Sequence, residues 1–197
     1  MNILAIDTAT DLCSISLYLN NKIVDTFEED KVVSHSKILA SNVDLVIKKN
    51  KIQSNELDFF LLSIGPGSYS GLRVSSSFLK GFAFAINKPI YAINTIEAMA
   101  YNIQDIENYY IAIYSHRDYV YYQEYSRGKK IGKQYCRQFS KLKKIKIYGY
   151  NLHKISNIKS IHCQPSSVNL INYFFDNKDC LIKQNITDIN PIYLNKS

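Results

Sequence analysis

The chain has 197 residues, of which 46% are hydrophobic and 21% are charged, and its net charge is +7. This length fits one domain or two small lobes, and the composition excludes a disordered chain. The longest apolar runs are only strand-sized, and the first residues lack a basic cluster, so we expect neither a membrane-spanning helix nor a signal peptide.

Three antiparallel strands are predicted at the start of the chain, over residues 2–7, 13–19 and 22–27. The second strand alternates apolar and polar side chains, which is typical of a strand with two different faces. Residues 8–11 form the first turn, and an Asn-Asn pair suits the second because asparagine tolerates positive φ.

Helices and strands then alternate. Ser34 is a good N-cap for an amphipathic helix over residues 35–50, and residues 59–64 indicate a buried strand. A tight loop at 65–71 leads into a helix that reaches about residue 86. A strand at 89–93 and a helix from Asn94 or Thr95 to about Tyr101 complete the order β-β-β-α-β-α-β-α. This mixed sheet with helices is half of an actin-like α/β architecture.

The second half gives weaker signals. A hairpin is predicted over 109–114 and 119–125, short strands at 146–148 and 158–162, and a helix at 165–175. We therefore expect an N-terminal lobe at 1–103 that carries the pairing surface. The rest, 104–197, forms a shortened and degenerate second lobe.

The positive charge is concentrated in residues 127–146, which contain nine lysines and arginines and no acid. Such a stretch could meet an RNA phosphate backbone. A solvated basic face is the favoured interpretation, because only Tyr135 and Phe139 interleave the charges and base stacking is poorly supported.

The loop Gly65-Pro66-Gly67-Ser68-Tyr69-Ser70-Gly71 is the strongest local motif. Its glycines and the following helix start are features of an anion cradle, but Leu72-Arg73 replaces the Lys-Ser/Thr of a P-loop. A strand-to-helix turn is favoured over a phosphate site. The candidate phosphate-contacting residues are Gly65, Gly67, Ser68, Gly71 and Arg73. The earlier turn at 7–10 lacks glycine, which favours a capped turn there as well.

Candidate catalytic groups are few. The histidines show no His-x-x-x-His spacing and no recognisable triad order. The cysteines form no Cys-x-x-Cys pair, which indicates neither a zinc site nor a disulfide framework and fits a reduced cytoplasm. We therefore expect no catalytic residue and no metal ligand. The residues considered are His35, His116, His153, His162, Cys13, Cys136, Cys163 and Cys180.

The helix at 70–86 is apolar almost all round, which predicts burial on more than one side. We expect the first-lobe helices to carry more apolar surface than their own sheet covers, with a second protein supplying the remaining cover. A charge at Leu72 should then abolish pairing and leave the fold intact. The predicted partner-contacting residues are His35, Ile38, Leu39, Asn42, Leu72, Val74, Ser75, Phe78 and Leu79.

Several of these segments together resemble the bacterial TsaB (YeaZ) family. The resemblance lies in the opening Ile3-Leu4-Ala5-Ile6-Asp7-Thr8-Ala9-Thr10, in His35-Ser36, in the run from Gly65 to Arg73, in Lys80-Gly81, and in Pro191-Ile192-Tyr193-Leu194. It is strong over residues 1 to about 100 and sparse afterwards.

That resemblance implies an actin-like ATPase (ASKHA, ribonuclease H-like) fold and a role in making threonylcarbamoyladenosine beside the tRNA anticodon. It implies a non-catalytic scaffold that pairs with the enzyme TsaD through the first-lobe helices, with the ATPase TsaE as a further partner. The chain would form a homodimer when TsaD is absent, and it would meet tRNA only indirectly. No cofactor is expected on this chain alone, although ATP or ADP could bind at the joint interface.

Departures from the family pattern fall in the second half. Ser115-His116-Arg117 stands where the family has Asp-Ala-Arg, and Asn195 replaces a terminal arginine. These changes leave the pairing lobe intact. A stand-alone ATP-binding enzyme of the same fold, either a kinase or a peptidase, remains the alternative, and ATP turnover or peptide cleavage by the chain alone would favour it.

Overall fold

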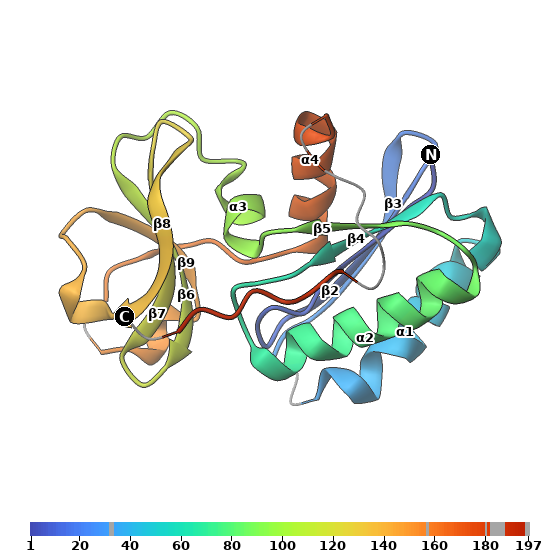
Figure 1. Cartoon of the computed structure of the whole chain (residues 1–197), viewed down its shortest axis with the longest axis horizontal. Helices are drawn as coiled ribbons and strands as arrows, with labels where there is room; N and C mark the ends of the chain where they lie inside the picture. Colours follow the sequence, from blue (N-terminus) through green and yellow to red (C-terminus); the bar gives the residue numbers. More distant parts are fainter. Residues whose placement is uncertain (32–33, 157, 180, 182–187, 196–197) are drawn as a thin grey trace.

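The computed structural model describes residues 1–31, 34–156, 158–179, 181 and 188–195. They form two mixed five-stranded sheets with helices on both faces of the first (Figure 1). The predicted α/β class is therefore confirmed.

The first sheet has the strand order β3-β2-β1-β4-β5. The first three strands form an antiparallel meander, and β4 and β5 add to β1 in parallel. The bounds are Ile3–Asp7 for β1, Cys13–Leu19 for β2, Lys22–Glu29 for β3, Phe59–Ser63 for β4 and Ile90–Ile93 for β5. The strands β1, β2 and β4 are buried on both faces, as expected of a central sheet covered by two layers.

Two long helices cover one face of this sheet. Figure 1 shows α1 (His35–Lys49) and α2 (Tyr69–Ala85) side by side beneath the strands, with α4 (Ser167–Asn177) on the opposite face. The short helix α3 (Thr95–Ala100) leads from the first sheet to the second. A 3₁₀ turn, η1 (Ser54–Glu56), joins α1 to β4.

The second sheet repeats the connectivity of the first. Its order β10-β9-β6-β7-β8 is an antiparallel meander with two added parallel strands. The bounds are Tyr109–His116 for β6, Tyr119–Ser126 for β7, Lys129–Gln138 for β8, Lys146–Tyr150 for β9 and Ile161–His162 for β10. Where the first sheet has α1 and α2, the described residues of the second have the 3₁₀ turns η2 (Phe139–Lys141) and η3 (Leu152–Lys154). This replacement is what shortens the second half.

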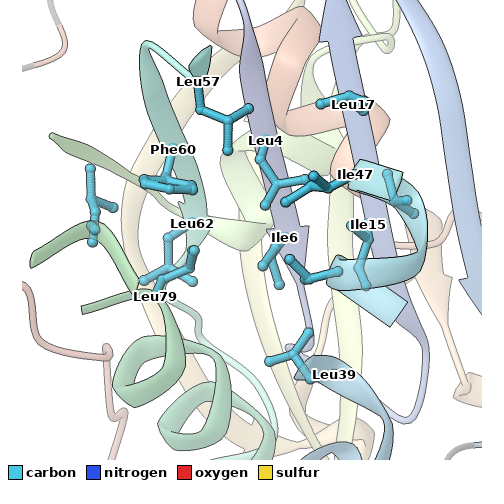
Figure 2. Packing of buried hydrophobic residues seen from close by; sticks show 14 of the residues in the cluster. Leu4, Ile6, Ile15, Leu17, Leu39, Ile47, Leu57, Phe60, Leu62 and Leu79 are labelled. Atoms are coloured by element: carbon cyan, nitrogen blue, oxygen red, sulfur yellow. The ribbon is translucent and has the colours of Figure 1, made fainter. Parts of the chain in front are cut away.

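The largest hydrophobic core lies between the first sheet and its two long helices. Figure 2 shows Leu39, Ile47 and Leu79 of the helices among the side chains of β1, β2 and β4. On the other face, Leu170, Ile171 and Phe174 of α4 pack on Ile3, Ala5 and Leu61.

The basic stretch, for which the sequence predicts no element, forms the edge strand β8 and the turn that follows it. Two predictions about the second half change. The helix begins at Ser167 rather than at Pro165, and the strand expected at 158–162 contains only Ile161–His162. Cys180 lies outside the described residues.

The end of the chain returns to the first sheet. Ile189 is fully buried in the core of the first sheet, and the Ile192 amide donates a 2.7 Å hydrogen bond to the Ile64 carbonyl. A boundary at 103/104 therefore separates the two sheets, but α4 and the segment 188–195 cross it and complete the first.

Candidate partner-binding surface

The helices α1 and α2 run parallel, with their first turns close together. Ser68 caps α2, since its side chain accepts a hydrogen bond from the Gly71 amide. Ser34 precedes α1 with an extended backbone but makes no side-chain capping bond. A small polar pocket of about 230 Å³ lies between the two helix starts.

Five of the predicted partner-contacting residues are buried inside the chain itself. The buried residues are His35, Leu39, Leu72, Ser75 and Leu79. Leu72 and Leu79 have no exposed surface, and Figure 2 shows Leu39 and Leu79 facing the strands. These side chains help to hold the two helices in place, because both helices pack directly on the same face of the sheet, α1 on β2 and β3 and α2 on β4 and β5. The expectation that a charge at Leu72 would spare the fold is therefore wrong.

The other predicted contacts are half-buried, and two of them, Val74 and Phe78, line the outer furrow between the helices. Ile38, Asn42, Val74 and Phe78 keep part of their side chains accessible. Two adjoining grooves, of about 360 and 450 Å³, share Ala40 and Phe78 as lining residues. The grooves are mainly apolar and continue along α2 past Ser77 and Gly81.

Sequence reasoning missed the most exposed apolar side chains of these helices. Phe84 of α2 is 79% exposed and Leu45 of α1 is 55% exposed. Gly81 follows Ser77 by four residues and Phe84 follows Gly81 by three, which places all three on one helix face. That spacing could have identified the outward face of α2, because the buried residues occupy the other positions.

The glycine-rich loop at 65–71 is closed against the β1–β2 turn. A Cβ on Gly67 would stand 2.1 Å from the Ala9 carbonyl oxygen, and one on Gly71 would stand 2.1 Å from the Thr8 carbonyl oxygen. The Ser68 amide already donates to the Ala9 carbonyl at 2.6 Å. The glycines thus permit close backbone contact, and the amides of Ser68 and Gly71 are used within the protein.

Arg73 lies beside the loop on the exposed side of α2. Its guanidinium stacks over the Tyr69 ring at 3.9 Å, and its Nε donates to the Tyr193 hydroxyl at 3.2 Å. The last predicted motif, 191–194, therefore meets the glycine-rich loop in space although it is far away in sequence.

The β1–β2 turn is held by its own side chains. The Asp7 carboxylate accepts from the Ala9 amide at 2.8 Å, and the Thr8 hydroxyl donates to the Gly71 carbonyl at 2.8 Å. Burial raises the pKa of Asp7 from its ordinary 3.8 to about 6. The predicted capped turn agrees with this geometry.

The histidines and cysteines do not gather into a reaction centre in the described part of the chain. His35 Nε2 lies 2.8 Å from the Thr10 carbonyl, and His116 stacks on Tyr119. Burial raises the pKa of Cys13 to about 12 and that of Cys163 to about 11, so both thiols stay protonated. Among the described residues, no three His, Cys, Asp or Glu side chains are grouped as metal ligands.

No described helix is both long and apolar enough to cross a bilayer.

A family model described as TsaD, tRNA N6-adenosine threonylcarbamoyltransferase, matches residues 29–178. A protein of Buchnera aphidicola subsp. Baizongia pistaciae, named tRNA threonylcarbamoyladenosine biosynthesis protein TsaB, is 32% identical over 130 residues. That match covers 64% of this chain and only 58% of the relative.

A TsaB protein of Buchnera aphidicola subsp. Acyrthosiphon pisum is 26% identical over 98% of this chain and 89% of its own length. Among solved structures, a Pseudomonas aeruginosa protein described as similar to the peptidase YeaZ superposes with a TM-score of 0.81. It is 20% identical and covers 98% of this chain and 99% of its own. The predicted two-lobe actin-like fold is confirmed.

Proposed function

Because this chain belongs to the family that the TsaD model describes, and within it to the TsaB (YeaZ) proteins, we propose that it acts in tRNA threonylcarbamoyladenosine synthesis as a non-catalytic subunit. In this proposal the outer furrow of α1 and α2 binds a TsaD-like enzyme and activates it. The chain forms a homodimer through the same furrow when that enzyme is absent.

The observation that carries this proposal is the apolar furrow, defined by Ala40, Val74, Phe78 and Gly81, with the exposed Phe84 farther along α2. Scattered exposed apolar residues are ordinary on a protein surface, but a continuous apolar groove indicates a binding site. Small residues along the furrow allow a partner helix to approach closely. A standard interface there would bury about 1,600 Å² in total.

The charged groups of the first lobe support a binding role over a catalytic one. Asp7 is buried and bonded to its own turn, and the Arg73 guanidinium lies over the Tyr69 ring and bonds the Tyr193 hydroxyl. ATP or ADP would bind where the two subunits meet and not on this chain alone. A TsaE-like ATPase would join the complex, tRNA would be held mainly by the enzyme, and the assembly would work in the cytoplasm.

A charge in the furrow tests the proposal. Ala40 is exposed and lines both grooves, so Ala40→Glu should leave the fold intact and prevent pairing. Ser140→Glu, which adds the same charge at an exposed site of the second lobe, is the matched control. The measurements are complex formation with the TsaD-like protein of the same organism by sedimentation and tRNA modification by the mixture.

Wild type and Ser140→Glu should pair and support modification, whereas Ala40→Glu should do neither. Full pairing by a folded Ala40→Glu protein would refute the furrow as the interface. ATP turnover or peptide cleavage by the purified chain alone would instead favour an enzyme of the same fold.

A further inference from the structure

A cavity of about 510 Å³ lies between the β7–β8 hairpin, α3 and α4, away from the α1–α2 furrow. Three tyrosines from three different elements line it, namely Tyr101 after α3, Tyr125 of β7 and Tyr173 of α4. This volume would hold a single nucleobase with its ribose, and aromatic walls suit base stacking.

Tyr125 is the unusual residue of this cavity. It is 2% exposed, and its hydroxyl has no hydrogen-bond partner among the described residues. A buried hydroxyl without a partner costs free energy, so it would gain from a ligand that supplies an acceptor or donor. Burial also raises the pKa of Tyr125, which keeps the hydroxyl protonated.

The carboxylates of the cavity are already engaged. Glu97 binds Lys130 Nζ and the Tyr173 hydroxyl, both at 2.8 Å, and Asp176 accepts from the Tyr101 hydroxyl at 2.5 Å. Lys130 offsets the charge of Glu97, and Lys129, which also lines the cavity, opposes the negative charge that Asp176 keeps.

Cations border the cavity along the edge strand. Residues 129–133 of β8 are all exposed, and Lys129 itself lines the cavity. Lys130 pairs with Glu97, but Lys129 and Lys133 make no ion pair with any described residue. An exposed edge strand with unpaired lysines offers charge to a polyanion and not to an apolar partner.

We propose that this cavity and the adjoining lysines bind single-stranded RNA. One unstacked base enters between the tyrosines and bonds the Tyr125 hydroxyl, while the flanking phosphates lie on Lys129 and Lys133. The site rests on this chain alone, so it does not depend on pairing with an enzyme. A free nucleotide presents the same base and phosphate chemistry, and the experiment separates the two ligands.

The test uses the full chain and a fluorescent single-stranded hexaribonucleotide, followed by anisotropy between about 50 and 200 mM salt. The double variant Lys129→Glu, Lys133→Glu is compared with Lys22→Glu, Lys51→Glu, which changes the net charge equally at exposed positions of the first lobe. Tyr125→Phe removes only the hydroxyl. AMP serves as competitor, and thermal unfolding checks that each variant is folded.

The affinity of wild type and of the first-lobe control should fall with salt equally. The β8 double variant should bind at least about tenfold more weakly, with a log–log salt slope about 1.4 smaller in magnitude, as two lost phosphate contacts imply. Tyr125→Phe should weaken binding severalfold and leave the salt slope unchanged.

Three results would overturn the proposal. Equal weakening by the control pair would show that only net charge matters. Unchanged affinity of Tyr125→Phe would show that no base bonds the Tyr125 hydroxyl in the cavity. AMP binding as tight as that of the hexanucleotide would show that Lys129 and Lys133 contact no flanking phosphate.

Discussion

Truncation of Phe84 is the sharpest test of the proposed pairing surface. Phe84 is 79% exposed, so about 160 Å² of a phenylalanine's roughly 200 Å² is available for burial by a partner. At about 25 cal/mol per Å² that area corresponds to at most about 4 kcal/mol. We expect Phe84→Ala to weaken pairing by about 2 kcal/mol or more, about 30-fold in Kd.

The same change should leave the lone chain almost as stable as before, within about 0.5 kcal/mol, because the ring packs on little of its own protein. Urea unfolding checks stability, and calorimetric titration with the TsaD-like partner checks affinity. Ile161→Ala, at a 48% exposed position of β10, is the control. Loss of affinity below about 0.5 kcal/mol, or an equal loss in the control, would refute the assignment.

Gly81→Ala should stabilise the lone chain by about 0.5–1 kcal/mol in urea unfolding, because its Cβ would meet open space in a helix interior. Gly67→Ala should cost more than about 2 kcal/mol, because its Cβ would clash with the backbone of Ala9. Leu72→Ala should cost about 2–5 kcal/mol, and its pairing should fall only in proportion to the unfolded fraction. The raised pKa of Asp7 means that the native state holds its proton more tightly than the unfolded chain. Stability should therefore fall by up to about 3 kcal/mol as pH rises from about 4 to 6, and Asp7→Asn should flatten this dependence in urea titrations at several pH values.

The first hundred residues were predictable because local pattern and tertiary burial agree there. The strands alternate or are wholly apolar, and the helices carry apolar residues at helical spacing. Hydrophobicity alone did not show that Phe84 points outward, although its spacing from Ser77 and Gly81 marks that face of α2. Leu72 and Leu79 are fully buried while Phe84 is exposed, yet all three are strongly apolar.

The second half was harder because its elements depend on distant partners. The first half of β8 is exposed throughout and carries no apolar alternation, so only its pairing with β7 identifies it as a strand. The tyrosine cavity joins residues from 97 to 177, and no spacing in the sequence brings them together.

The return of α4 and of residues 188–195 to the first sheet affects how the protein emerges from the ribosome. The sheet strands and both long helices are complete by residue 93, yet one face of the sheet stays bare until α4 is synthesised. The opposite core still lacks Ile189 at that stage. At about 5–20 residues per second, the nascent chain would carry uncovered strands for roughly 5–20 seconds. That interval is when a chaperone would be most useful to it.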